Sequence, residues 1–347
     1  LSGVFRDVYL TTTPVGYISD FKLTHDIDSN YKSGALNAEM LLDGVVDNNE
    51  IEMTIYDANG DIVAFSSKNI SSPGKYTLRA TVPFISLWSS EHPYLYTVVF
   101  TLRDKTGEAT EYASCKTGFR KIEIRNSVIY INGERLIMKG VNRHEFCLEG
   151  GRAVSREIMG KDIMLLKSNN INAVRTSHYP NAPMFYQLCD EYGFYVVDEC
   201  DLEVHGTEHV VRNMNPSFLI SGNPEWEKSY VDRMIRTLER DKNSISIIFW
   251  SLGNESHFGE NHVKMSDYVR SRDTERLIHY EGTYSGVQRW VEVMPPVDPC
   301  VDVVSEMYAT LATVEMQGKN EDGDKRPYYL CEYAHAMGMG PGSIEEY

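Results

Sequence analysis

Residues 245–255 read ISIIFWSLGNE, an apolar run that ends in a glycine and two polar residues. Such a run is typical of a strand that is buried on both faces of a parallel sheet. After residue 119 about seven runs of this kind alternate with longer helical stretches, for example 155–170 and 224–243. This alternation predicts repeated βα units. The predicted strands are residues 136–145, 171–179, 194–203, 245–255, 277–282, 301–308 and 328–333.

The number of strands bears on how the sheet closes. A (β/α)₈ or TIM barrel needs eight strands, whereas residues 120–347 supply about seven. We therefore predict a truncated barrel whose eighth strand lies beyond Tyr347. The chain begins with Leu1 rather than Met, which also predicts a piece of a longer protein.

Residues 12–119 follow a different pattern, with about seven short strand-like segments between turn signals. These segments predict an immunoglobulin-like β-sandwich. We find no cluster of histidines and carboxylates in it, and expect it to be a spacer or scaffold. The fold class predicted for the chain is thus multidomain, β plus α/β. The turn signals are Asn59-Gly60, Ser72-Pro73-Gly74 and Lys105-Thr106-Gly107.

Composition excludes several classes of protein. The 347 residues include 34 Lys and Arg against 50 Asp and Glu, a net charge of −16, which disfavours nucleic acids and anionic membranes as partners. The longest apolar runs fall far short of the ~20 residues that span a bilayer. The six cysteines are scattered without a CxxC pair, which predicts reduced thiols and a cytoplasmic protein.

Polar side chains follow every predicted strand of the barrel. In such barrels the carboxyl ends of the strands build the active site. Any one of these groups alone is most simply a solvated strand end, but together they predict a functional face. They are residues 142–145, 175–178, 198–205, 254–255, 280–281, 306–308 and 332–335.

Two carboxylates emerge from strands that the pattern predicts to be buried, Glu255 and Glu332. Closure of the barrel would aim both into one opening. A pair of carboxylates suits cleavage of a glycosidic bond, with retention of configuration when they lie ~5 Å apart. By position, Asn254 is a candidate to bind a sugar hydroxyl and Tyr308 a candidate donor to the nucleophilic carboxylate.

Glu203 and His205 share one face of an extended strand end, because side chains alternate with a period of two. With Glu255 as a third ligand, this set suits Mg²⁺ better than tetrahedral Zn²⁺. Residues 205–209, HGTEH, also match the H-x-x-E-H pattern of zinc peptidases. We interpret that match as accidental, since the pattern needs a helix whereas Gly206 and Thr207 follow a strand.

Several stretches resemble the β-galactosidases of glycoside hydrolase family two, and the resemblance covers nearly the whole chain. Residues 3–8 resemble the last strand of that family's N-terminal jelly-roll domain. Residues 87–89 and 93–96 resemble its sandwich domain, and residues 118–120 the entry to its barrel. The most specific stretches are NRHE (142–145), RTSHYPN (175–181), WSLGNES (250–256) and CEYAHAMG (331–338).

The resemblance implies three domains and a retaining mechanism. Residues 1–11 would end the jelly roll, 12–119 form the sandwich and 120–347 form the barrel, which lacks its last βα unit. Glu255 would be the acid/base and Glu332 the nucleophile, in a double displacement through a covalent galactosyl-enzyme. Mg²⁺ would bind Glu203, His205 and Glu255. The positions implied to contact galactose or support the carboxylates are His144, His178, Asn254, Tyr308 and His335.

The expected substrate is a small β-galactoside such as lactose, cleaved at a terminal non-reducing β-D-galactose. The alternatives are a β-glucuronidase or β-mannosidase of the same family, or a non-catalytic carbohydrate-binding protein. Glu203-Val204-His205 and the context of His335 favour the galactosidase. The family's sodium ligands are expected outside this segment, and the full-length protein is expected to be a homo-oligomer. Met339 and Cys200-Asp201 depart from the family pattern, and we expect the segment alone to be poorly stable or inactive.

Overall fold

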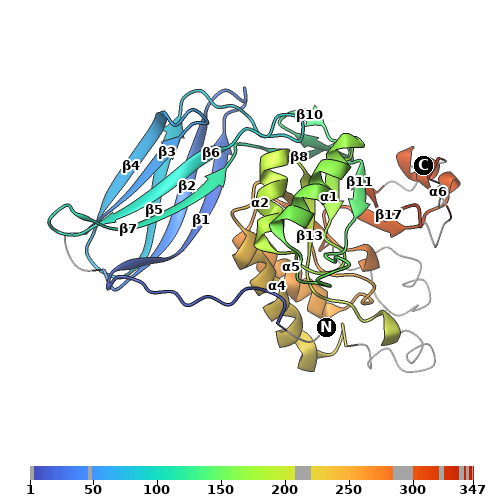
Figure 1. Ribbon diagram of the computed structural model, residues 1–347. Helices are drawn as coiled ribbons and strands as arrows, with labels where there is room; N and C mark the ends of the chain where they lie inside the picture. Colours follow the sequence, from blue (N-terminus) through green and yellow to red (C-terminus); the bar gives the residue numbers. More distant parts are fainter. Residues whose placement is uncertain are drawn as a thin grey trace.

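The computed structural model describes residues 4–45, 49–207, 220–283, 300–319, 324–335, 340, 344–345 and 347. Figure 1 shows a β-sandwich on one side and a mixed helix and strand domain on the other. The predicted fold class is confirmed by this arrangement.

The sandwich contains a three-stranded sheet, β1-β2-β5, and a four-stranded sheet, β4-β3-β6-β7. Every pairing is antiparallel. In β3, Ile51, Met53 and Ile55 alternate with less buried residues, because successive side chains point to opposite faces. The predicted turn at Asn59-Gly60 joins β3 to β4. The strands are β1 (Tyr17–Ile27), β2 (Gly34–Asp43), β3 (Asn49–Tyr56), β4 (Ile62–Ile70), β5 (Gly74–Val82), β6 (Tyr96–Arg103) and β7 (Ala109–Thr117).

The second domain is built on a parallel sheet in the order β11-β12-β13-β14-β15, with a separate parallel pair, β16-β17. Each of the seven predicted strands contains one observed strand, so the predicted order is confirmed. The observed strands are shorter at one or both ends, and the polar residues that follow them lie outside the strands. They are β11 (Gly140–Asn142), β12 (Ala173–Arg175), β13 (Tyr195–Glu199), β14 (Ile247–Ser251), β15 (Leu277–His279), β16 (Val304–Met307) and β17 (Tyr328–Glu332).

Helices lie around this sheet (Figure 1). In α4, Tyr230, Met234 and Leu238 are spaced by four residues and are buried against the strands, as expected for one face of a helix. A small antiparallel sheet precedes the barrel strands and was not anticipated from the sequence: β8 (Ile122–Arg125), β9 (Val128–Ile131) and β10 (Glu134–Arg135). The helices are α1 (Arg156–Ser168), α2 (Pro183–Tyr192), α4 (Glu227–Asp241), α5 (Glu260–Arg272) and α6 (Leu311–Gly318), with 3₁₀ turns η1 (His205–Thr207), η3 (Pro224–Trp226) and η4 (Glu281–Thr283).

The first and last strands of the barrel domain approach each other without a described strand between them. Asn142 Nδ2 donates to the Cys331 carbonyl at 3.1 Å, and the Tyr333 hydroxyl donates to the Gly140 carbonyl at 2.9 Å. These side-chain contacts join β11 to β17 where a strand ladder would close a barrel. An eighth strand beyond Tyr347 stays a prediction.

Polar contacts hold the sandwich against the barrel. Lys242 Nζ donates to the Asp20 carboxylate at 2.7 Å, and the His25 backbone N–H donates to Glu275 at 2.5 Å. Buried Trp88 donates from its ring nitrogen to the Asp190 carbonyl at 2.9 Å. These contacts pack the two domains against each other.

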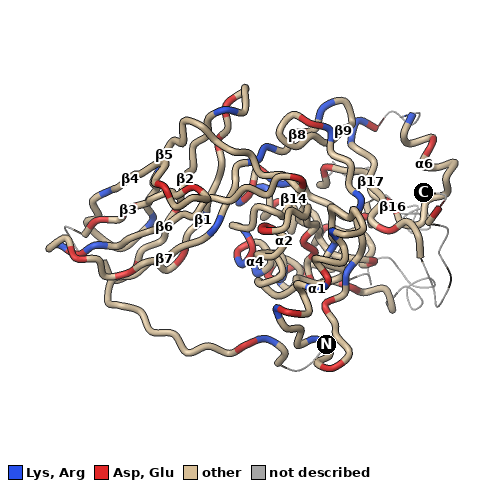
Figure 2. The backbone as a smooth tube through the Cα atoms, turned by 45° about the horizontal axis from the view of Figure 1, so that its top comes forward, with Lys and Arg blue, Asp and Glu red and all other residues tan. Residues whose placement is uncertain are grey.

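The segment before the sandwich runs across to the barrel, as Figures 1 and 2 both show. Residues 4–16 form no strand. The assignment of residues 1–11 to a jelly-roll strand stays a prediction, since the other strands of such a domain would lie outside this chain. Figure 2 also shows acidic and basic positions mixed over both domains. Within the described residues, no helix is both long and apolar enough to cross a membrane.

Candidate active site

Glu332, the predicted nucleophile, is the last residue of β17 and is held through both carboxylate oxygens. Arg175 Nη1 donates to Oε1 at 2.9 Å, and the Tyr308 hydroxyl donates to Oε2. The Tyr308 backbone N–H also donates to the Glu332 carbonyl at 2.8 Å. Donors on both oxygens of a carboxylate fix its orientation, which a nucleophile requires. The predicted contact between Tyr308 and this carboxylate is present.

Arg175, at the end of β12, donates to Glu332 and to two further side chains. It was not among the predicted site residues. Its side chain is buried, and its remaining nitrogens donate to Glu199 at 2.7 Å and to Asn254 at 2.8 Å. The sequence signal was present, because Arg175 opens the polar stretch after the second strand. This one buried guanidinium therefore joins Glu332, Glu199 and Asn254 through hydrogen bonds.

Glu199 is the second residue that sequence reasoning missed. Its buried carboxylate accepts from Arg175, from His178 Nδ1 at 2.7 Å and from Ser251 Oγ at 2.8 Å. Burial alone would raise its pKa, but the charge of Arg175 and the hydrogen bond from His178 hold the pKa of Glu199 below its ordinary value. Glu199 therefore stays charged and orients both Arg175 and His178.

Glu255, the predicted acid/base, follows β14 in a left-handed backbone conformation with φ of 39°. Its backbone N–H donates to Glu281 Oε1 at 2.7 Å. Burial raises the pKa of Glu281 to about 8, and the charge of Arg175 opposes that shift. Few non-glycine residues adopt this backbone region, and those that do cluster at functional sites. Glu281 thus fixes the loop that carries the candidate acid/base.

Asn254 is buried, and its side-chain amide joins Arg175 to Glu203. Its Oδ1 accepts from Arg175, and its Nδ2 donates to Glu203 Oε2 at 2.7 Å. An amide carries two acceptor lone pairs and two N–H groups, so one of each remains for a ligand. This arrangement is compatible with the predicted contact to a sugar hydroxyl.

The predicted metal ligands Glu203, His205 and Glu255 lie together. Each offers one ligand atom, and these atoms are all within 4.8 Å of one another. His205 Nδ1 is 2.6 Å from Glu255 Oε2. Burial and the neighbouring Glu255 carboxylate raise the pKa of Glu203, against the hydrogen bond from Asn254. Two carboxylates and one imidazole with exposed edges fit Mg²⁺, which keeps several waters.

The H-x-x-E-H pattern begins at His205 in the 3₁₀ turn η1. Its remaining residues, 208 and 209, lie outside the described residues. The interpretation of that match as accidental therefore stays a prediction.

Three histidines complete the group. The His144 and His178 rings meet edge to face at 5.6 Å, and His178 Nε2 lies 3.9 Å from Glu332 Oε1. Burial and the charge of His178 lower the pKa of His144. His335 stacks on Tyr308 with ring centroids 5.5 Å apart. Every predicted site residue is thus described, and each has a contact within this one cluster.

The two candidate catalytic carboxylates are linked electrostatically through Tyr308. Burial, the hydrogen bond to Glu332 and the charges of Glu332 and Glu255 all raise the pKa of Tyr308. The charge of each carboxylate thus acts on the same phenol. Tyr308, like Glu255, has a left-handed backbone, with φ of 52°.

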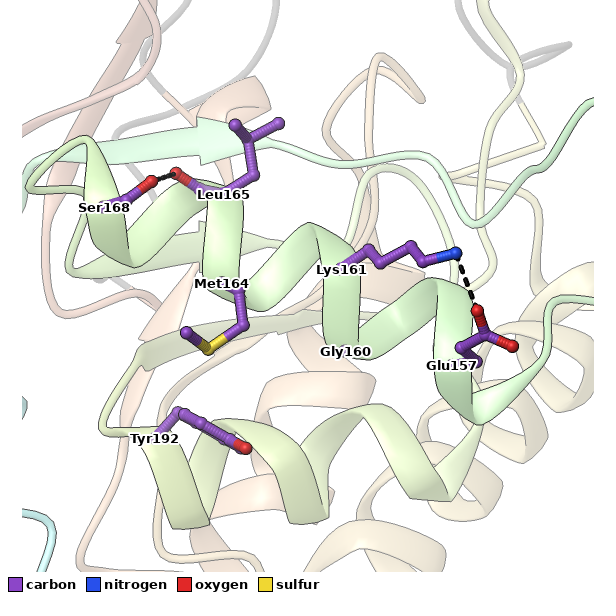
Figure 3. Close-up of a pocket in the computed structure, with 7 residues that line it drawn as sticks. All are labelled: Glu157, Gly160, Lys161, Met164, Leu165, Ser168 and Tyr192. Carbon is purple, nitrogen blue, oxygen red and sulfur yellow. Dashed lines mark hydrogen bonds and ion pairs between the residues drawn. The ribbon is translucent and has the colours of Figure 1, made fainter.

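A separate groove of about 690 Å³ lies on the outer face of α1, beside the end of α2 (Figure 3). Met164, Leu165 and Tyr192 line it. Its charged lining residues Lys161 and Glu157 form an ion pair with each other, 2.7 Å from Nζ to Oε1. Since the groove is on the helix layer rather than at the strand ends, we assign it no chemistry.

Comparison with known proteins places the chain in a family. The model of the TIM barrel domain of glycosyl hydrolases family 2 matches residues 122–347, and a second family 2 model matches residues 16–120. The chain belongs to glycosyl hydrolases family 2. Both matches follow the observed division into a sandwich and a barrel.

Curated relatives of this family 2 chain are named β-galactosidase. One from Priestia megaterium is 42% identical over all of this chain and 33% of its own length. One from Clostridium acetobutylicum is 41% identical over all of this chain and 37% of its own length. The chain thus spans about a third of the relatives that it matches.

Solved structures agree on the fold. An FMN-binding β-glucuronidase from Facaelibacterium prausnitzii L2-6 has a TM-score of 0.77 at 22% identity, covering 94% of this chain and 51% of that one. A β-glycosidase from Bacteroides vulgatus has a TM-score of 0.74 at 24% identity, covering 92% of this chain and 39% of that one. At such identities the likeness concerns the fold alone.

Proposed function

We propose that this chain carries the catalytic centre of a retaining β-galactosidase. The observation that supports this most is the Glu332 carboxylate, which Arg175 and Tyr308 hold between them through hydrogen bonds. The substrate class comes from the curated relatives, which are 37–42% identical over the whole chain. The substrate would be a small β-galactoside such as lactose.

The mechanism proceeds in two displacements. Glu332 attacks the anomeric carbon, the bond to the leaving oxygen breaks, and Glu255 gives that oxygen its proton. Glu255 then takes a proton from water, which attacks the same carbon and releases Glu332. Arg175 orients Glu332 through its hydrogen bond, and Tyr308 donates to the carboxylate as it leaves.

Glu203, His205 and Glu255 would hold a Mg²⁺ ion. When bound, the ion supplies positive charge beside the acid/base carboxylate. Ligands for a sodium ion would lie outside this segment. We also propose a cytoplasmic homo-oligomer, for which the scattered cysteines support the location.

The test is covalent trapping of the intact protein with a 2-deoxy-2-fluoro-β-galactosyl reagent, followed by mass measurement and peptide mapping. We expect a single adduct on Glu332 in the wild type and none in Glu332→Gln. No adduct from folded, Mg²⁺-loaded protein would refute the proposal. A panel of aryl β-galactosides, β-glucuronides and β-mannosides distinguishes the family alternatives, and sugar binding without turnover would identify a non-catalytic binding protein.

A further inference from the structure

The segment before the sandwich contacts the barrel beside the candidate site. We propose that Arg6 in this segment is a positioning residue for sugar binding, acting through Glu145 and His144. This inference rests on the proposed function. Arg6 belongs to neither the sandwich nor the barrel, so it would couple a third part of the protein to the active site.

The first observation is a buried carboxylate whose charged partner comes from this segment. The Glu145 side chain is 0% exposed and forms an ion pair with Arg6, whose own side chain is 32% exposed. Glu145 Oε1 also accepts from the Ala182 backbone N–H at 2.9 Å, at the start of α2, where no side chain of the helix itself provides a cap. Removing one partner of a buried ion pair destabilises a protein strongly.

The second observation connects Glu145 to the site. The Tyr179 hydroxyl accepts from the Glu145 backbone N–H at 3.1 Å and lies 3.2 Å from His144 Nδ1. Glu145, whose carboxylate pairs with Arg6, thus holds the Tyr179 hydroxyl through its backbone N–H. That hydroxyl contacts the ring of His144. His144 in turn contacts His178, which binds Glu199.

The third observation is a stack of cations and aromatic rings that includes the Tyr179 ring. The guanidinium carbon of Arg152 lies 3.7 Å from the centre of the Tyr179 ring and 4.8 Å from that of Phe5. Arg6 Nη1 donates to the Arg152 carbonyl at 3.2 Å, and the Arg6 guanidinium also lies over Phe5. Contacts of this kind add to the ion pair in holding Tyr179.

Together these contacts join two loops, residues 143–155 after β11 and residues 176–182 after β12. One loop carries His144 and the other carries His178. Because neither histidine is the acid/base or the nucleophile, displacing the loops should weaken sugar binding more than bond cleavage. A uniform loss of binding raises KM and leaves kcat nearly unchanged.

The test compares Arg6→Met with Arg6→Lys in the intact protein, and with Arg79→Met as a control. Arg79 serves as the control because it also forms an ion pair, with Asp26, but that pair is exposed and lies in the sandwich. We expect Arg6→Met to raise KM about tenfold with kcat within about threefold, and Arg6→Lys to restore most of the affinity. Wild-type KM in Arg6→Met, or a loss confined to kcat, would overturn the proposal.

A double variant keeps the test valid if Arg6→Met does not fold. Arg6→Met with Glu145→Gln removes the unpaired charge while retaining an acceptor for the Ala182 N–H. It should fold and still show a raised KM, because the tie to the N-terminal segment is gone. A folded double variant with the KM of the wild type would overturn the positioning role.

Hydrogen exchange separates this inference from the proposed function. The amides of Glu145 and Ala182 donate the two hydrogen bonds described above, so peptides containing them should exchange about fivefold faster in Arg6→Met than in Arg79→Met. If the wild type cleaves no β-galactoside, the proposed function fails and exchange alone tests the role of Arg6. Unchanged exchange would refute that role.

Discussion

Tyr308→Phe isolates one hydroxyl in the candidate site. The substitution removes the hydrogen bond to Glu332 and retains the ring that stacks on His335. Tyr308 is 44% exposed, so little effect on the free energy of unfolding is expected. A hydrogen bond to a charged group is worth about 1.5–3 kcal/mol, which corresponds to roughly a 10–150-fold change in rate.

We expect this loss in the second displacement, where Glu332 regains its full charge as it leaves the sugar. Rapid mixing with an aryl β-galactoside should then show a burst of one aglycone per active site, followed by slow turnover. Reactivation of the 2-fluorogalactosyl adduct should slow by the same factor. Tyr192→Phe, at similar exposure on α2, is the matched control. Unchanged turnover without a burst, or equal slowing of both displacements, would refute the reasoning.

Three further predictions concern charged groups. Arg175→Met leaves the Glu199 carboxylate buried without its cation and should cost about 3–5 kcal/mol in urea unfolding, while adding Glu199→Gln should restore stability but not kcat. Glu203→Gln should raise the Mg²⁺ concentration needed for half-maximal activity on the order of tenfold, whereas Asp201→Asn should not. Burial would raise the pKa of Glu239, but hydrogen bonds from Arg272 and other partners hold it at about 2, below its ordinary 4.5. Its stabilisation should be present above pH 4.5 and lost as the pH falls toward 2. The free energy of unfolding in urea should therefore be about 1–2 kcal/mol lower for Glu239→Gln than for the wild type at pH 7, and the two should converge on acidification.

The strands of the barrel were predictable because their signal is local. In β14 all five residues are buried, and such a run appears in the sequence as an uninterrupted apolar segment. The ends of the strands were less predictable, since the polar residues that follow make their contacts with distant parts of the chain. The hairpin formed by β8 and β9 was missed because its strands have only four residues each.

The site was predictable in its members but not in its organisation. Glu255, Glu332 and the metal ligands were found because each follows an apolar run or matches a spacing. Arg175 and Glu199 were missed as site residues, since charged residues are usually exposed and only the folded chain shows these two to be buried together. Arg175 and Glu332 are 157 residues apart in sequence, so no local pattern encodes their ion pair.

The two residues with left-handed backbones show why this organisation depends on the whole domain. Glu255 and Tyr308 are poorly suited to positive φ by local preference, yet each is held there by a hydrogen bond that its own backbone N–H donates. The acceptor for Glu255 is the Glu281 side chain after β15, and the acceptor for Tyr308 is the carbonyl of Glu332 on β17. In both cases a residue on a neighbouring strand or just after it supplies the acceptor that offsets the local cost. The proposed acid/base and the donor to the proposed nucleophile are therefore positioned by the assembled sheet, which local sequence preference would not do.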